Sequence, residues 1–274
     1  MFFFKSHGLG NDYLIADVEA PPSAGQVRLA CDRNRGMGSD GLLWGCASTR
    51  ADAGLRIFNP DGSEAEISGN GLRIFAHWLH HHQGFSRDLT IEVGGRVVAC
   101  RVDGDRVQVD MGKASFVPAE VPVRAEAPLI ETPLPVAGLR GTAVGMGNPH
   151  CVVFVEQDLD SLPWRAWGEA LERHPLFPNH TNVQIARVLA EDSLEIRIWE
   201  RGAGPTLASG SSACAAAAAA VRTGRCRGQI AVEAPGGTLQ VSVGADWVLT
   251  LEGPVEEVGT FTPAPAFLAR WERG

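Results

Sequence analysis

Short runs of alternating apolar and polar residues, separated by glycine, aspartate and proline, recur along almost the whole chain. Alternation with a period of two is typical of strands that bury one face. Turn pairs such as Gly94-Gly95, Asp103-Gly104 and Gly236-Gly237 join several of these runs and favour hairpins. The clearest predicted strands are 89–93, 96–102, 106–111, 151–155, 194–199, 229–234, 239–243 and 247–251.

Two segments depart from this alternation and have helical character. They cover residues 71–82 and 211–223, and the second is almost pure alanine. Alanine is the best helix former, and its small side chain lets a neighbouring element approach closely. A third, amphipathic helix is predicted over 162–174.

The order of these features repeats along the chain. Each half has strands, a polar loop, a Ser-Gly helix start and then a hairpin-like run. This order predicts an α/β (α+β) protein of two pseudo-symmetric domains, residues 1–115 and 116–259, although the two halves share no evident sequence identity. We expect the C-terminal tail, about 260–274, to pack back on the first domain.

Composition and charge narrow the class of protein. Apolar residues make up 45% of the 274 residues and charged residues 20%, as in a globular protein. The net charge of −8 disfavours a nucleic-acid partner. The start of the chain does not resemble a signal peptide, and the apolar run 213–221 is too short to span a membrane. Six scattered cysteines without a Cys-x-x-Cys pair indicate reduced thiols, so we expect a cytoplasmic protein.

Three possible kinds of site are disfavoured by the sequence: a dinucleotide site, a metal site and a serine hydrolase site. Gly36–Gly41 matches a dinucleotide fingerprint, but Leu42-Leu-Trp after it predicts a strand where that site needs a helix. The run His80-His81-His82 cannot converge on one metal ion, because adjacent helical residues point to different faces. No Gly-x-Ser-x-Gly elbow surrounds Ser68 or Ser209, which argues against an ordinary serine hydrolase.

Ser68 and Ser209 are the most informative candidates for chemistry. Each precedes a glycine at a predicted helix start, where a serine hydroxyl is a good N-cap. Each also follows a polar loop richer in amides and charges than capping requires. Two helix N-termini around one small cavity would hold an amino-acid carboxylate, with the two hydroxyls on opposite faces of its α-carbon. That arrangement suits a two-sided proton transfer.

Seven motifs, taken together and in order, resemble the diaminopimelate epimerase family over nearly the whole chain. They are Lys5-Ser-His-Gly-Leu-Gly-Asn11-Asp-Tyr, Asp32-Arg-Asn-Arg-Gly-Met-Gly-Ser-Asp-Gly41, Asn59-Pro-Asp-Gly-Ser-Glu64, Gly69-Asn70-Gly71-x-Arg73, Gly147-Asn148-Pro-His150, Thr181-Asn182-Val and Glu200-Arg201-Gly-Ala-Gly.

The resemblance implies a fold, an activity and a set of site residues. Each domain would be a β-barrel-like sheet around a central helix, with the active site in the cleft between the domains. The enzyme would be an isomerase of lysine and peptidoglycan precursor synthesis that converts LL-diaminopimelate to the meso form without pyridoxal phosphate, metal or other cofactor. The family often forms dimers, so a homodimer is a further expectation. By analogy, Ser68, Ser209, His150 and Glu200 occupy catalytic positions, and Asn11, Asn59, Gly69, Asn70, Asn148, Asn182, Arg201, Gly210 and Ser211 bind substrate.

The two serines are also the main departure from the family, which has catalytic cysteines at both positions. A thiolate is accessible near neutral pH at a helix N-terminus, whereas a serine hydroxyl needs a strong neighbouring base. Each pKa unit corresponds to about 1.4 kcal/mol, so a simple swap would cost several orders of magnitude in rate. Deliberate replacement and natural divergence could both place serines here. Pro205, Ser211-Ser212 and Ile74 also differ from the usual family residues, and this favours divergence.

Three functions therefore stay open, in order of preference. The first is a diaminopimelate epimerase whose serines are activated by His150, Glu200 or another base. The second is an isomerase or racemase of another amino acid or small acid, in which His150 or Glu200 moves the proton itself. The third is a non-catalytic protein that binds a diaminopimelate-like ligand. Retention of both His150 and Glu200 argues against a mere binder.

Overall fold

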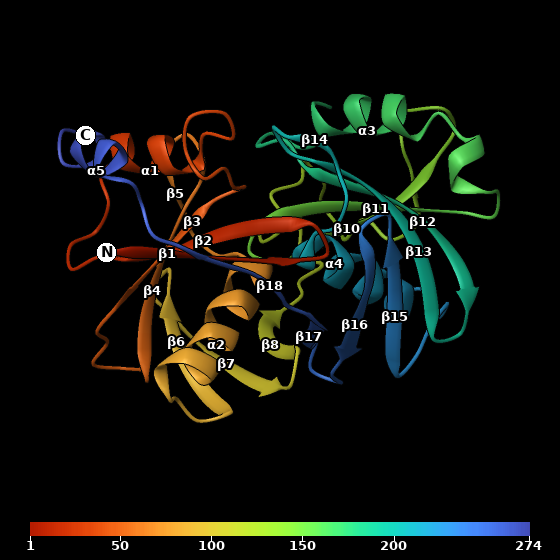
Figure 1. The fold of residues 1–274 in the computed structure, drawn as a ribbon. Coiled ribbons are helices and arrows are strands. Elements are labelled where there is room, and N and C mark those ends of the chain that lie inside the picture. Colours follow the sequence, from red (N-terminus) through yellow and green to blue (C-terminus); the bar gives the residue numbers. More distant parts are fainter. The chain divides into compact units, whose positions relative to one another are not determined.

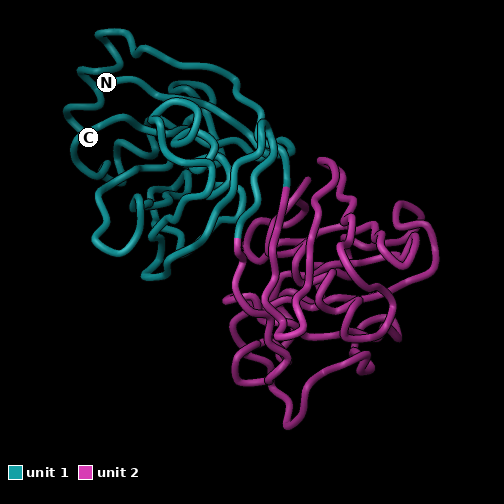
Figure 2. The backbone as a smooth tube through the Cα atoms, turned by 90° about the horizontal axis from the view of Figure 1, so that it is seen from below, with its two compact units in different colours: residues 1–109, 253–274 teal, residues 110–252 magenta.

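The computed structural model describes residues 1–274 and divides into two compact units, which Figure 2 shows in different colours. The first unit contains Met1–Val109 and Gly253–Gly274, and the second contains Asp110–Glu252. The chain therefore leaves the first unit once and returns to it near its end. No helix is both long enough and apolar enough to cross a membrane.

The strands of the first unit pair in one continuous series. Neighbours are antiparallel except for β2–β3 and β4–β6, which are parallel, and the short β5 (Glu64–Ala65) pairs with β4. In spatial order the strands are β18 (Glu256–Phe261), β1 (Phe2–Gly8), β2 (Asn11–Asp17), β3 (Leu42–Cys46), β4 (Ala53–Phe58), β6 (Asp88–Val93), β7 (Arg96–Asp103) and β8 (Arg106–Lys113).

The second unit repeats this pairing scheme. Its parallel pairs are β11–β12 and β13–β15, and the short β14 (Gly204–Thr206) pairs with β13 just as β5 pairs with β4. In spatial order the strands are β9 (Thr132–Pro133), β10 (Arg140–Gly145), β11 (Pro149–Val155), β12 (Asn182–Ala190), β13 (Ser193–Glu200), β15 (Gln229–Ala234), β16 (Gly237–Val243) and β17 (Val248–Pro254).

Helices connect the parallel pairs at equivalent places in the two units, because parallel neighbours need a crossover connection. The first crossover contains α1 (Ala24–Cys31) in the first unit and α3 (Trp164–Glu172) in the second, where the turn η1 (Leu159–Ser161) precedes it. The second crossover contains α2 (Gly69–Gln83) and α4 (Gly210–Arg222). This matching order confirms the predicted pair of pseudo-symmetric α/β units.

The second crossover helix of each unit is enclosed by strands (Figure 1). Helix α2 packs on β1, β2, β6 and β7, while α4 contacts β10 to β13 together with β15 and β16. The first eleven residues of α2, Gly69–Leu79, are all buried, so this helix has no solvent-facing stripe over its first three turns. Alanine-rich α4 is buried from Ser212 to Ala220. The sequence therefore predicted the enclosed helices correctly.

Two helices that the sequence did not indicate cover the outside of the first unit. Helix α5 (Pro265–Trp271) belongs to the returning C-terminal segment, and its Trp271 ring lies 5.2 Å from that of Phe3 in an edge-on contact. Trp271 shares a core with Val27 and Ala30 of α1.

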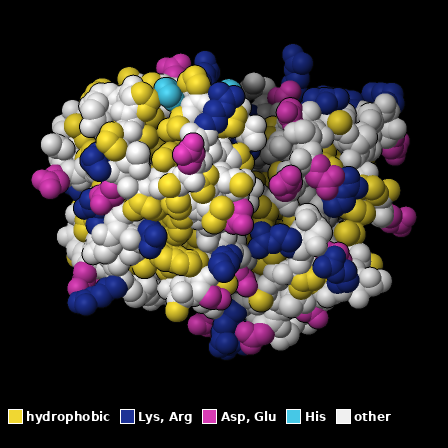
Figure 3. All heavy atoms as spheres, turned by 180° about the vertical axis from the view of Figure 1, so that it is seen from behind, with side chains coloured by type: hydrophobic (Ala, Val, Ile, Leu, Met, Phe, Trp, Pro, Cys, Tyr) yellow, Lys and Arg dark blue, Asp and Glu magenta, His cyan; other side chains and the backbone are white.

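On the face shown in Figure 3, basic and acidic side chains are interspersed around an apolar area rather than separated by sign.

The predicted elements agree well with the observed ones. Each of the eight clearest predicted strands corresponds to an observed strand, and the three predicted helices correspond to α2, α3 and α4. Two central helices begin earlier than expected, at Gly69 and Gly210, directly after the two serines. A strand, β3, follows the Gly36–Gly41 run, as predicted, so the helix of a dinucleotide site does not follow it.

Candidate active site

Ser68 occupies the N-cap of α2 with extended backbone angles of −139° and 117°. Its Oγ accepts a hydrogen bond from the Gly71 amide at 3.0 Å, which satisfies one of the amides that lack a partner within the helix. The Tyr13 hydroxyl also donates to Ser68 Oγ, at 3.2 Å. Ser68 is therefore both the N-cap of α2 and the hydrogen-bond acceptor of the Tyr13 phenol.

The side chain of Asn70, in the first turn of α2, fixes Asn11 at the start of β2. Asn70 Nδ2 donates to the backbone oxygen of Asn11 at 2.7 Å and to its Oδ1 at 2.9 Å, while Arg73 donates to Asn70 Oδ1 at 2.8 Å. A Cβ on Gly8 would lie 2.0 Å from Asn70 Oδ1, so only glycine allows the β1–β2 hairpin to pass this close. The amides of Asn11 and Asn70 thus form one rigid group.

A network of charges supports the other side of Asn11. Its Nδ2 donates to Asp40 Oδ2 at 2.9 Å, and Arg33 bridges Asp40 and Asp12 with contacts of 2.7 Å each. Lys5 Nζ lies 2.8 Å from the Asp12 carboxylate. Burial alone would raise the pKa of Asp12, but the hydrogen bonds from Arg33 and Lys5 outweigh it and lower this pKa to about 2. Asp12 is therefore ionised at neutral pH and holds both cations.

The predicted binding residue Asn59 lies in a different setting. It follows β4 and is exposed, with its Nδ2 donating to Ser63 Oγ at 3.0 Å inside the turn that leads to β5. Its backbone amide donates to the Ser63 carbonyl at 2.8 Å. Asn59 therefore stabilises the polar loop before Ser68, and its side chain does not belong to the Asn11–Asn70 group.

Ser209 occupies the N-cap of α4 with backbone angles of −149° and 126°, close to those of Ser68. Its side chain makes no capping hydrogen bond, unlike that of Ser68. Gly210 behind it is buried and Ser211 is half-buried. The two helix starts thus share a backbone geometry and differ in how their hydroxyls are used.

A buried chain of polar side chains runs from the strands of the second unit to the first turn of α4. His150 Nε2 lies 2.9 Å from Asn148 Oδ1, and its Nδ1 lies 3.1 Å from Gln184 Nε2. Gln184 Nε2 also donates to Ser212 Oγ at 3.0 Å. These contacts are consistent with a neutral imidazole that accepts at Nδ1 and donates at Nε2. Burial lowers the pKa of His150 to about 3, which keeps the ring uncharged.

Asn182 lies opposite His150 in the parallel pair β11–β12. Its Nδ2 donates to the Pro149 carbonyl at 3.0 Å, and its Oδ1 accepts from the backbone amide of Arg201 at 3.0 Å. The exposed Arg201 side chain donates to the carbonyl of Asn179 at 3.2 Å. Asn182 therefore ties β11 to the turn after Glu200, where β13 ends.

Glu172 at the end of α3 holds that same turn, although the sequence did not single it out. Its carboxylate accepts from Trp199 Nε1 at 2.8 Å and from the Gly202 amide at 2.9 Å. Burial would raise the pKa of Glu172, but these hydrogen bonds outweigh it and leave the pKa below its usual range. The buried, ionised carboxylate thus holds the Trp199 side chain and the Gly202 backbone, which flank Arg201 in the sequence.

The structure collects the predicted site residues into a group in each unit. In the first unit, Ser68, Gly69, Asn70 and Asn11 surround the start of α2. In the second, hydrogen bonds and strand pairing link Asn148, His150, Asn182 and Arg201, while Ser209, Gly210 and Ser211 form the start of α4. Tyr13, Asp40 and Gln184 contact these groups, and Glu172 contacts Gly202 next to Arg201; none of the four was among the predicted site residues.

The six cysteines of the chain lie away from the two predicted catalytic positions. None of the six is in a disulfide bond, and none lies at the first residues of α2 or α4. Burial raises the pKa of Cys151 to about 12, and burial also raises the pKa of Cys31, Cys46 and Cys226. A buried thiol of raised pKa is a poor proton acceptor at neutral pH.

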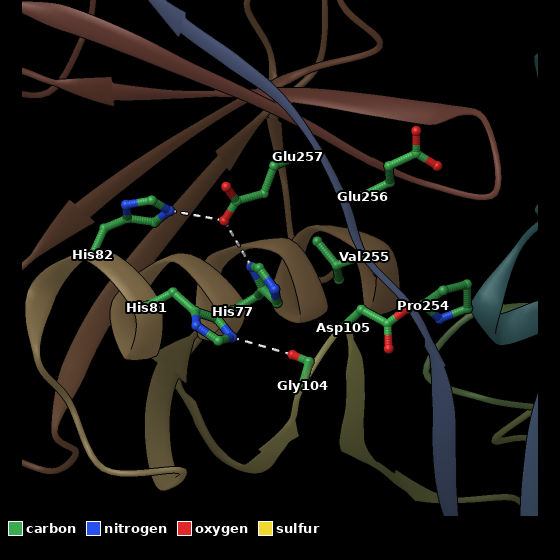
Figure 4. A pocket seen from close by; sticks show the side chains of 9 residues that line it. All are labelled: His77, His81, His82, Gly104, Asp105, Pro254, Val255, Glu256 and Glu257. Atoms are coloured by element: carbon green, nitrogen blue, oxygen red, sulfur yellow. Dashed lines mark hydrogen bonds and ion pairs between the residues drawn. The ribbon is translucent and has the colours of Figure 1, made fainter.

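A pocket of about 630 Å³ lies elsewhere in the first unit and contains none of the predicted site residues. Figure 4 shows His77 and His82 pointing toward the Glu257 carboxylate, at 3.4 Å and 2.8 Å, while His81 contacts the carbonyl of Gly104. Burial lowers the pKa of His77 to about 4, and the neighbouring His81 acts in the same direction. No group of three or more metal-binding side chains with suitable geometry is present.

Replacing Glu172 with alanine should destabilise the second unit. The change leaves the Trp199 indole and the Gly202 amide without their charged acceptor, and each of these partly buried hydrogen bonds is worth about 1–2 kcal/mol. We expect a total loss of about 2–4 kcal/mol in the free energy of unfolding, measured by urea denaturation. Glu169→Ala on the exposed face of the same helix is the matched control and should change it little. Equal losses in the two variants would contradict the role of Glu172.

Stability should fall as the pH is lowered from 7 to 5. His77 and His150 stay neutral in the folded protein down to about pH 4 and pH 3, because their pKa values are lowered from 6.5. The unfolded chain binds more protons in this range, so each histidine costs at most about 1.4 kcal/mol per pH unit. Urea denaturation at both pH values should show a smaller pH effect for His77→Phe than for the parent protein. An identical pH effect in His77→Phe and the parent protein would contradict this assignment.

Comparison with known proteins places the chain in a family. The model of the diaminopimelate epimerase family matches residues 3–117 and 142–258. Diaminopimelate epimerase 2 of Nostoc sp. is 44% identical over 269 residues, which cover 94% of each chain. The diaminopimelate epimerase of Desulfitobacterium hafniense is 41% identical over 274 residues, covering 94% of this chain and 96% of that relative.

Solved structures of lower identity share the fold. A predicted epimerase of Pseudomonas aeruginosa superposes with a TM-score of 0.70 at 19% identity, covering 96% of this chain and 98% of that one. A hydroxyproline epimerase of Agrobacterium vitis, solved with bound trans-4-OH-L-proline, gives 0.69 at 15% identity, covering 99% and 98%. The family model and the relatives above 40% identity carry the assignment: the chain belongs to the diaminopimelate epimerase family.

Proposed function

We propose that the protein is a cofactor-independent amino-acid epimerase that converts LL-diaminopimelate to meso-diaminopimelate with serines in the proton-transfer positions. The observation that carries the proposal is the match to relatives named diaminopimelate epimerase over 94% of the chain. The amide groups expected to bind such a substrate are retained around both helix starts. The proposal requires Ser68 and Ser209 to act on the same α-carbon.

The chemistry of the two helix starts supports a reaction through a carbanion. Removing the α-proton of an amino acid places negative charge on the α-carbon and its carboxylate. The backbone amides of Gly69 and Asn70, and those of Gly210 and Ser211, lie at the positive ends of α2 and α4. Such preorganised donors stabilise developing negative charge without having to reorient during the reaction. Asn11, Asn148, Asn182 and Arg201 supply groups for the other ends of a substrate with two ammonium and two carboxylate groups.

The state of His150 weakens the alternative in which it moves the proton itself. The ring is buried and its pKa is lowered to about 3, so it is a weak base. Both ring nitrogens are already in hydrogen bonds, with Asn148 and Gln184. We therefore assign His150 a supporting role, in which it orients Asn148. Glu200 keeps its proposed place among the catalytic residues, beside the turn that carries Arg201.

The direct test is to incubate the protein with LL-diaminopimelate in deuterated water. We expect deuterium at the α-carbon together with meso product, measured by NMR and by chiral chromatography. Binding without either would indicate a non-catalytic ligand-binding protein. If neither binding nor exchange occurs, the substrate assignment is wrong, and other amino acids become the candidates.

Restoring the family thiols should raise the activity. A thiol ionises several pKa units more readily than an alcohol, and each unit is worth about a factor of ten. We expect Ser68→Cys with Ser209→Cys to increase kcat/KM for diaminopimelate by about two orders of magnitude or more. Ser242→Cys, on strand β16, is a control that adds a thiol away from both helix starts. No gain in the double variant would show that the pocket has diverged in more than its two hydroxyls.

A further inference from the structure

The hydrogen bond from Tyr13 to Ser68 links a weak proton carrier to a stronger one. The two oxygens are 3.2 Å apart, and the phenol is the donor. Ser68 Oγ also accepts from the Gly71 amide at 3.0 Å, so its own proton points away from both donors and is available to a third group. The phenol thus stands behind a serine hydroxyl that can face a substrate.

Tyr13 is held in place by its surroundings. It is the single tyrosine of the chain, lies in β2 and is 8% exposed. A Cβ on Gly41 would lie 2.5 Å from Tyr13 Cε1, so the ring packs closely against the backbone of Gly41. Pairing of Tyr13 with Ser6 in β1 fixes the strand register. The phenol therefore reaches Ser68 from a rigid position.

The acidities of the two groups explain why such a pair would matter. An alcohol is many units less acidic than a thiol, and an isolated serine alkoxide is out of reach at neutral pH. A phenol ordinarily ionises near pH 10, not far above a thiol. If the proton that leaves Ser68 is replaced at once by the phenol proton, the charge that remains is a phenolate and not an alkoxide.

We propose that Tyr13 and Ser68 form a two-step proton relay that takes the place of the family thiol in the first unit. When the relay delivers a proton, the Ser68 O–H bond breaks as the new C–H bond forms on the carbanion. The Tyr13 O–H bond breaks in the same event and its proton passes to Ser68. The resulting phenolate regains a proton from water. Proton removal from the substrate follows the same path in reverse, from α-carbon to Ser68 and from Ser68 to the phenolate.

The charge that the relay creates lies near the start of α2. The Gly71 amide donates to Ser68 Oγ, which is 3.2 Å from the phenol oxygen, so the phenolate lies close to the positive end of a 15-residue helix. This inference rests on the proposed function, since it assumes that Ser68 faces the reacting carbon. It adds Tyr13 as a residue that acts through Ser68.

The test compares Tyr13→Phe in two backgrounds, the parent protein and Ser68→Cys, by the rate of α-deuteration of diaminopimelate. In the parent background we expect kcat to fall at least about tenfold, with KM changed less than about twofold, because the variant removes only proton transfer. In the Ser68→Cys background the thiol needs no relay, so Tyr13→Phe should change kcat less than about twofold. Ser6→Ala, which removes a buried hydroxyl opposite Tyr13, is the control and should leave kcat unchanged.

The outcomes separate failure of the relay from failure of the proposed function. Equal losses in both backgrounds would mean that Tyr13 is structural and would overturn the relay. An unchanged rate for Tyr13→Phe in the parent protein would overturn it as well, and the function would stand. Activity that appears only after Ser68→Cys with Ser209→Cys would show that Ser68 carries no proton, again overturning the relay alone. Absence of exchange and binding in every variant would overturn the proposed function and the relay with it.

Discussion

Burying the start of a helix leaves backbone amides that neither the helix nor water can satisfy, and both units are organised around this constraint. Helices α2 and α4 begin inside their units, with Gly69, Asn70 and Gly210 all buried. Each helix is therefore preceded by a serine and surrounded by strands that carry asparagine and histidine. An anion is the natural partner of unsatisfied amides at a helix dipole, and this is why we propose that a carboxylate binds at these starts.

The two units differ in how side chains contact the amides at the start of the central helix. Ser68 accepts from the Gly71 amide and from Tyr13, so its lone pairs are occupied in the absence of a ligand. Ser209 has the same backbone conformation but makes no capping bond. The second unit has its polar contacts one turn further along, where the Ser212 hydroxyl joins Gln184 and His150. The two helix starts therefore carry unequal hydroxyls, of which only that of Ser68 is hydrogen-bonded to a phenol.

Much of the fold could be predicted because its signals are local. Alternating strands, hairpin turn pairs and the alanine run of α4 all lie in short windows of sequence. Helix α1 was not predicted because it is short, although the spacing of Ser23 and Gln26 is that of a capping box. Helix α5 owes its position to a contact between Trp271 and Phe3, at opposite ends of the chain, and no local pattern shows such a contact.

In the candidate site, too, some residues could be predicted from local motifs, whereas others depend on contacts between distant parts of the chain. Motif residues such as Asn11 and Asn70 could be named from sequence, and the structure joins them by hydrogen bonds. The side chains that position the site residues could not be named from the sequence. Asp40, Glu172 and Gln184 make their contacts across strand pairs and turns, with residues distant in the chain. Tyr13 lies inside a recognised motif, yet its hydroxyl is hydrogen-bonded to Ser68, 55 residues away in the sequence. The side chain of Asn59, for which the motif predicts a role in substrate binding, is hydrogen-bonded within the local turn, a contact that the motif did not indicate.

The most direct test of a serine-based epimerase site is a crystal structure of the protein with LL-diaminopimelate bound. We expect the α-carboxylate on the amides of Gly69 and Asn70, with Ser68 Oγ about 3–3.5 Å from the α-carbon and still bonded to Tyr13. Ligand bound away from the start of α2, or a Ser68 hydroxyl turned from the α-carbon, would contradict the assignment of Ser68 as a proton carrier.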